Sequence, residues 1–278
     1  MILKMIYKNK LIFIGLIIIV FFILIAIFAP LITTYNPTSQ NLMESLQTPN
    51  AKHIFGTDIF GQDIFSRVIY GARLSLYISS VSVFIAAAVG IFLGAIAGFL
   101  NKFVDEVIMR FFDILLAFPS ILLAIAIMAV LGQGEMNLIL AISIYSLPRF
   151  ARITRGTVFA EKKKDYVEAA KVSGESDWNI LLRYILPNSL EPIIVQLALR
   201  MATAILSIAA LGFLGLGVKP PLPEWGTDIA LSFQYIQIYP YLGIFPGIAI
   251  FLVVIGFNLI GDGLNKSLNP KTKGRNKS

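Results

Sequence analysis

Residues 149–188 read RFARITRGTVFAEKKKDYVEAAKVSGESDWNILLRYILPN, a basic stretch between two long apolar runs. Its middle part holds Glu168-Ala169-Ala170, Gly174 and Leu186-Pro187. A positively charged stretch between apolar runs is typical of a loop that joins two membrane spans. The apolar segments on both sides of this loop therefore decide the fold.

The composition indicates a membrane protein. Of the 278 residues, 57% are hydrophobic and 14% are charged, and the mean hydropathy is +0.79. An ordinary soluble domain carries about 25% charged residues. The chain has no cysteine, which excludes disulfides, thiolate metal sites and cysteine nucleophiles.

Six apolar segments approach the roughly 20 residues that a helix needs to cross a bilayer. The fourth is the weakest because Pro148 and Arg149 interrupt it, and Pro119 is expected to kink the third. The first is too long for a typical signal peptide, so we interpret it as a retained anchor. The segments are 11–33, 74–100, 107–131, 137–155, 190–213 and 241–263.

Positive charges predict how these spans are oriented. Most of the 23 Lys and Arg residues lie before the first span, in the 149–189 loop and in the C-terminal tail. Both termini are therefore predicted to be cytoplasmic, with residues 34–73 and 214–240 facing outward. The net charge of +7 follows from this topology and does not indicate a nucleic-acid partner.

The predicted spans divide this all-α membrane protein into three parts. Residues 1–73 hold the first transmembrane helix and an extracytoplasmic segment. Residues 74–265 hold a core of five helices with a cytoplasmic loop at 156–189. Residues 266–278 form a basic cytoplasmic tail.

Glycines recur at a helical spacing in the second span. Gly90, Gly94 and Gly98 lie four residues apart and so share one helix face. Small residues at this spacing let another helix backbone approach closely. We interpret them as bundle packing rather than as ligand contacts.

The 149–188 stretch is expected to contain two short helices. Asp165 is expected to cap the first, with Glu168 three residues later as in a capping box. Gly174 is expected to end it, because glycine tolerates a left-handed terminus.

The second helix is expected to start at Ser176 or Asp177 and to stop at Pro187. Its apolar residues recur at i, i+3, i+4 and i+7, which predicts one apolar stripe. Such a helix either lies on the membrane surface or enters a groove on a soluble partner, and spacing alone leaves both open. The stripe consists of Trp178, Leu181, Leu182 and Ile185.

The loop resembles the EAA loop of bacterial ABC importer permeases, where a cytosolic ATPase docks. The family pattern is EAA, three residues, Gly, nine residues, Ile, one residue and Leu-Pro. Here Tyr184 stands at the isoleucine position. The resemblance implies a MetI-like permease core and an ATPase-coupling role for the matched residues. These are Glu168, Ala169, Ala170, Gly174, Leu186 and Pro187.

Three further stretches resemble the dipeptide, oligopeptide and nickel branch of that family. Residues 56–73 are similar to its GTDxxGRDxxSRxxxGxR signature, although Gln62 replaces an arginine. Residues 213–226 read FLGLGVKPPLPEWG and residues 257–264 read FNLIGDGL, and both are similar to the same branch. The resemblance covers nearly the whole chain, and it does not identify the cargo.

The resemblance implies a permease subunit of an ATP-driven importer in the bacterial plasma (inner) membrane, for dipeptides or oligopeptides. A glutathione or nickel-chelate importer is the alternative within the family. The implied partners are a second homologous permease, two cytosolic ATPases, an extracytoplasmic substrate-binding protein and membrane lipid.

No enzyme activity and no cofactor are expected of this chain. A phosphate-binding loop of the form GxxxxGK[ST] is missing, so the partner ATPases would bind the ATP. One histidine and no cysteine leave no convincing catalytic set. An ion-coupled secondary transporter is a competing class, but it predicts inverted repeats and several intramembrane charges, which we do not find.

Arg200 and Gln196 are the candidate residues of a substrate path. Arg200 lies about ten residues into the fifth span, roughly 15 Å along the helix. A charge at that depth usually faces a cavity or a partner. It either pairs with a carboxylate of a neighbouring subunit or contacts the carboxylate of a passing peptide, and Gln196 shares its face.

The remaining polar clusters are interpreted as structural. His53, Asp58 and Asp63 lie in a glycine-rich segment, where turn chemistry is a more common role than metal binding. The charges at the start of the third span have spacings that favour local pairing along one helix. They are Asp105, Glu106, Arg110 and Asp113.

Overall fold

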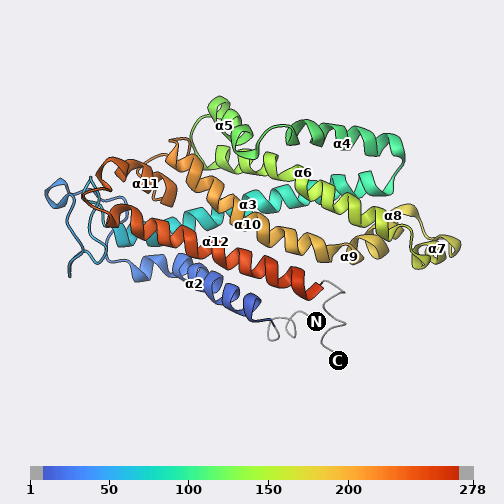
Figure 1. The fold of residues 1–278 in the computed structure, drawn as a ribbon, viewed down its shortest axis with the longest axis horizontal. Coiled ribbons are helices and arrows are strands. Elements are labelled where there is room, and N and C mark those ends of the chain that lie inside the picture. The colour runs from blue at the N-terminus through green and yellow to red at the C-terminus, as the bar shows by residue number, and fades with distance from the viewer. Residues whose placement is uncertain (1–8, 269–278) are drawn as a thin grey trace.

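Four long helices run along the longest axis of the molecule (Figure 1). They are α2 (Lys10–Ile32), α3 (Ile64–Phe99), α10 (Leu190–Phe213) and α12 (Tyr241–Leu268). Each is long and apolar enough to cross a membrane. The computed structural model describes residues 9–268, and this part of the chain is helical with no strand.

The third predicted span is broken in two. Helices α4 (Lys102–Leu116) and α5 (Ser120–Leu131) meet at an angle of 86°. Pro119 lies directly before α5. A proline has no N–H group, but a helix makes no hydrogen bond to an N–H group at this position. The predicted kink is therefore confirmed, and the two helices together form a fifth candidate span.

Helix α6 (Glu135–Glu161) takes the place of the fourth predicted span and contains Pro148 without ending there. It is not among the candidate spans, because arginines interrupt its apolar surface. The described residues thus hold four candidate spans, or five with the bent pair, and six spans remain a prediction. The shorter helices are η1 (Leu42–Glu44), α7 (Asp165–Val172), α8 (Asp177–Asn179), η2 (Ile180–Ile185), α9 (Leu186–Asn188), α11 (Trp225–Ser232) and η3 (Phe233–Tyr235).

Helices α3 and α6 approach each other closely because three glycines of α3 face α6. A Cβ atom at Gly90 would lie 2.6 Å from the Cβ of Phe150. A Cβ at Gly94 would overlap the backbone of Ala151, and one at Gly98 would meet α6 in the same way. Their interpretation as packing residues is confirmed, and the contact borders the largest apolar core.

A second core surrounds the fully buried Trp225, at the start of α11. Its indole Nε1 donates to the carbonyl of Val68 at 3.0 Å. Gly71 of α3 makes room for the ring, since a Cβ there would lie 2.7 Å from the indole Cδ1. This core joins α2, α3, α10 and α12 at the end of the molecule that carries α11 (Figure 1).

The start of α2 lies beside the end of α12. The side-chain amide of Asn9 donates to the carbonyl of Gly263 at 2.8 Å and to the hydroxyl of Ser267 at 3.1 Å. Both ends of the described chain point toward the end of the molecule that carries α7 without reaching it, whereas residues 33–63 and α11 are at the other end (Figure 1). This arrangement agrees with the predicted sidedness.

Most of the predicted basic tail lies outside the described residues, as do Lys4 and Lys8. The tail was predicted to begin at residue 266, and the structure describes it only to residue 268. The orientation of the two termini therefore remains a prediction.

The charges of α4 pair across helices more than along one helix. Asp105 and Asp113 both bind arginines of α6, and the Nη2 atom of Arg152 lies 2.8 Å from Asp113. Glu106 does make a local contact, 3.7 Å from Lys102, although Lys102 is not a member of the predicted cluster. The prediction of local pairing was wrong for the two aspartates, because the spacing of residues does not show that α4 lies against α6.

The glycine contact between α3 and α6 predicts the effect of a single added methyl group. Gly94→Ala should lower the free energy of unfolding by about 1–3 kcal/mol, the usual range for overpacking. Gly156→Ala on α6 is the matched control, because nothing lies within 4 Å of a Cβ there. Equal stability of the two purified variants, measured by thermal unfolding in detergent, would contradict the close contact.

Candidate functional site

Residues 162–189 form a compact helical segment at one end of the bundle (Figure 1). Helix α7 comes first, followed by α8, the π-helical turn η2 and α9. The segment then joins α10 at Ser189, which is buried.

Apolar side chains fix the 162–189 segment to the ends of α3 and α6. The cluster combines buried residues of the segment with Ala95 and Phe99 of α3 and Val158 of α6. Tyr184, which departs from the family pattern, packs against this cluster with Tyr166. The segment is therefore attached to the bundle and does not extend freely from it. Its buried members are Val167, Ala170, Ile180, Leu181 and Ile185.

Helix α7 ends as predicted, at a glycine with left-handed backbone. Gly174 has a φ of +81°, and the N–H of Glu175 donates to the carbonyl of Ala170 at 3.2 Å. This is the hydrogen bond that closes a glycine-terminated helix. A Cβ at Gly174 would find nothing within 4 Å, so the glycine also leaves open space on the surface.

The start of α7 differs from the prediction. Lys164 occupies the cap position and makes no side-chain hydrogen bond there, while Asp165 is the first helical residue. The capping box with Glu168 is thus not formed. Both carboxylates lie in the first helical turn instead, where negative charge is favourable.

The second helix starts as predicted, but its apolar stripe is split. The hydroxyl of Ser176 accepts from the N–H of Asn179 at 3.3 Å. The π-helical turn then widens the helix, so that Leu181 is buried while Trp178 and Leu182 are 54% and 55% exposed. The prediction of a single apolar stripe was wrong because it took the segment to be a regular α-helix throughout.

Pro187 does not stop the helix where the sequence predicts. It lies in the first turn of α9, a position that tolerates proline, and α9 continues to Asn188.

The six residues of the EAA pattern are divided between two faces. Ala170 is buried against the bundle, and Leu186 is half-buried. The other four are exposed, as are Val172, Trp178 and Leu182 of the same segment. An exposed surface of small and apolar residues is typical of a docking site. The exposed four are Glu168, Ala169, Gly174 and Pro187.

Arg200 and Gln196 line one groove, as their shared helix face predicts. The groove has a volume of about 430 Å³ and lies between α4, α6 and α10. Arg149 and Arg152 also line this groove, which was not predicted from the sequence. Their i, i+3 spacing could have indicated that the two arginines share one face of a helix. The lining residues are Leu116, Arg149, Arg152, Ile153, Gln196 and Arg200.

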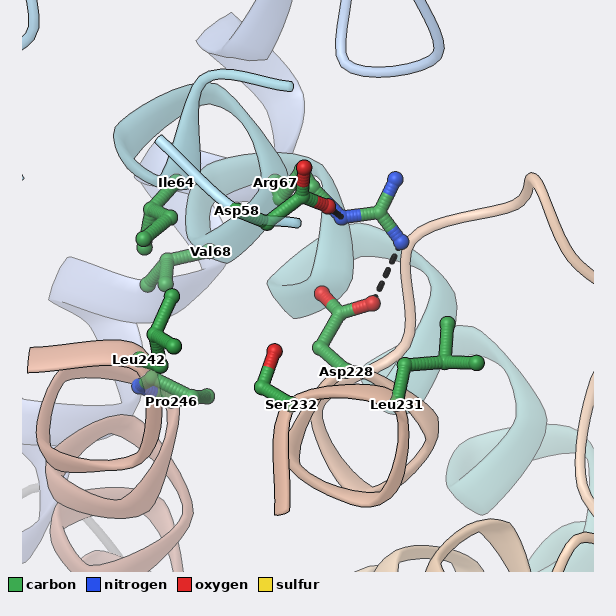
Figure 2. Close-up of a pocket in the computed structure, with 9 residues that line it drawn as sticks. All are labelled: Asp58, Ile64, Arg67, Val68, Asp228, Leu231, Ser232, Leu242 and Pro246. Carbon is green, nitrogen blue, oxygen red and sulfur yellow. Dashed lines mark hydrogen bonds and ion pairs between the residues drawn. The ribbon is translucent and has the colours of Figure 1, made fainter. Parts of the chain in front are cut away.

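At the opposite end of the bundle, a buried arginine joins three segments (Figure 2). Arg67 of α3 pairs with Asp228 of α11, and its Nη1 donates to the carbonyls of Pro37 and Pro221 at 2.9 and 3.1 Å. Burial raises the pKa of Asp228, and the positive charge of Arg67 partly offsets this rise. The pocket that Asp58, Arg67 and Asp228 line has a volume of only about 10 Å³, too little for a substrate.

Gln62, which replaces the arginine of the family signature, belongs to the same cluster. Its side-chain oxygen accepts from Nη1 of Arg67 at 2.7 Å, and its Nε2 donates to the carbonyl of Thr38 at 3.1 Å. The replacement thus retains polar contacts at this position.

His53, Asp58 and Asp63 do not converge as metal ligands. The Nδ1 atom of His53 lies 2.9 Å from Asp63, whose other carboxylate oxygen accepts from the backbone of Ser66 and caps α3. Asp58 accepts from the backbone of Gln62 at 2.8 Å, a turn contact. Between residues 9 and 268, no three His, Asp or Glu residues are grouped as a metal site.

Two families match different parts of the chain. Residues 90–274 match the family described as "Binding-protein-dependent transport system inner membrane component". Residues 1–49 match the "N-terminal TM domain of oligopeptide transport permease C".

Several curated proteins are similar over nearly the whole chain. The dipeptide transport system permease of Alkalihalophilus pseudofirmus is 52% identical over 97% of this chain and 89% of its own length. The di/tripeptide permease of Pseudomonas aeruginosa is 44% identical over 93% of this chain and 88% of its own. The glutathione permease GsiD of Escherichia coli is 46% identical over 92% of this chain and 85% of its own length.

The fold is also known from a solved structure. A chain of the MetNI methionine ABC transporter superposes with a TM-score of 0.61 at 17% identity, covering 73% of this chain and 96% of that one. The all-helical, MetI-like permease fold is thus confirmed. Together with the family match and the apolar helices, it shows that this chain belongs to the inner membrane components of binding-protein-dependent transport systems.

Proposed function

We propose that this chain is a membrane-spanning subunit of an ATP-driven importer of short peptides. The observation that carries the proposal is the 52% identity to a dipeptide permease over nearly the whole chain. Glutathione is the second candidate, since a glutathione permease is 46% identical. The exposed residues of the EAA pattern, here named the EAA surface, support an importer because they offer a place for an ATPase to dock. They are Glu168, Ala169, Gly174 and Pro187.

The proposed complex contains a second homologous permease, two cytosolic ATPases and an extracytoplasmic substrate-binding protein. The family description supports a binding protein. The chain itself is proposed to have no catalytic activity and to bind no ATP. Glu168, Ala169 and Gly174 are proposed to meet the ATPase, and Ala170 to hold the docking surface on the bundle.

We further propose six membrane passes with both termini in the cytoplasm. The passes are α2, α3, the bent pair α4–α5, α6, α10 and α12. The start of α2 lies beside the end of α12, which supports an even number of passes. Since the 162–189 segment packs on α3 and α6, movement of a docked ATPase would carry those helices with it.

Uptake measurements test the substrate. Cells that lack the chain should lose uptake of radiolabelled dialanine and regain it when the chain is restored. Restored uptake of glutathione but not of dialanine would favour the second candidate. Restoration of neither would contradict the proposed function.

Substitution of Gly174 tests the docking surface. Gly174→Trp should abolish both uptake and co-purification of the ATPase, because the ring fills the open space beside the helix end. Membrane insertion of the chain should be unchanged. Gly174→Ala is the control, since it strains the same positive φ but adds little bulk. Equal losses in the two variants would assign the effect to backbone strain and contradict docking.

Cysteine labelling tests the topology, because the chain has no cysteine of its own. Met43 and Val172 are 94% and 89% exposed, which makes them a matched pair. An impermeant thiol reagent should label Met43→Cys in intact cells and Val172→Cys only after permeabilisation. Labelling of Val172→Cys in intact cells would contradict the proposed orientation.

A further inference from the structure

We propose that the groove between α4, α6 and α10, here named the arginine groove, binds the terminal carboxylate of a peptide in transit. The proposal rests on the peptide-import function above and names the residues that recognise the substrate. Arg149 and Arg200 would hold the carboxylate, with Gln196 beside them. All three line the same groove of about 430 Å³.

The groove carries positive charge that the described chain does not neutralise. Arg152 is paired with Asp113 at 2.8 Å. No carboxylate between residues 9 and 268 forms an ion pair with Arg149 or Arg200. The Nε atom of Arg200 is also buried without a hydrogen-bond partner among the described residues. A buried donor of a charged group is destabilising unless something accepts from it, so the groove favours an anion.

The depth of Arg200 argues against a lipid phosphate as that anion. Arg200 lies about 15 Å from the start of α10, at the usual rise per residue. Helix α10 has 24 residues, so this position is near its middle. Lipid head groups lie near the ends of a spanning helix, whereas a charge at mid-depth faces a cavity or a partner.

The chemistry of the groove fits a carboxylate. Two guanidinium groups come from facing helices, and each offers a planar pair of N–H donors that matches a carboxylate. The volume is within the range of small-molecule sites, about 300–1,000 Å³. A second groove of about 400 Å³ shares Ile153 and Gln196 and extends to Glu191 at the start of α10. The carboxylate site therefore adjoins an open route toward the end that carries the 162–189 segment.

The test uses the purified importer complex in nanodiscs, without the binding protein. Equilibrium binding of radiolabelled dialanine is compared with that of its C-terminal amide. We expect the wild-type complex to prefer the carboxylate by at least about tenfold, the lower range for a hydrogen bond to a charged group. Arg149→Gln and Arg200→Gln should each reduce this preference severalfold, and Arg200→Lys should keep part of it.

Arg110→Gln is the matched control, since Arg110 is exposed on α4 outside the groove, and it should keep the wild-type preference. The inference is overturned if the Arg200→Gln complex keeps the full preference. It is also overturned if a complex that imports dialanine binds both probes equally or binds neither.

Loss of complex yield in proportion to loss of binding would instead show that Arg200 pairs with a partner subunit. Failure of the wild type to import any peptide would contradict the proposed function itself.

Discussion

The glycine contact between α3 and α6 determines the position of the rest of the structure. Gly90, Gly94 and Gly98 bring the two backbones together, and any larger residue there would separate them. The ends of both helices then stand side by side and present Phe99 and Val158 to the 162–189 segment. The location of the EAA surface is thus a consequence of packing within the bundle.

Helix α3 also connects the two ends of the molecule. Its 36 residues extend about 54 Å at the usual rise per residue. One end contributes Arg67 to the buried cluster with Asp228, and the other contributes Phe99 to the cluster beneath the 162–189 segment. Both clusters are buried, so a displacement of the segment would be transmitted along a continuous helix. In the proposed complex, that helix would link the side of the binding protein with the side of the ATPase.

Local features could be predicted from the sequence better than contacts between helices. The helix end at Gly174 and the kink at Pro119 each depend on the backbone preference of one residue, and both were confirmed. The exposure of Leu182 was not predicted, because it depends on a π-helical turn. The meeting of Arg149 with Arg200 was missed as well, since it requires α6 and α10 to lie together.

The packing of the 162–189 segment on α3 and α6 predicts that the segment moves as one body with these helices. A distance measurement between spin labels at Ala160→Cys and Ser173→Cys, both exposed positions, tests it most directly. The labelled complex would be compared without nucleotide and while it hydrolyses ATP. We expect one distance distribution that stays the same in both states. A distribution that shifts or splits with ATP would contradict it, because the segment would then move independently of the bundle.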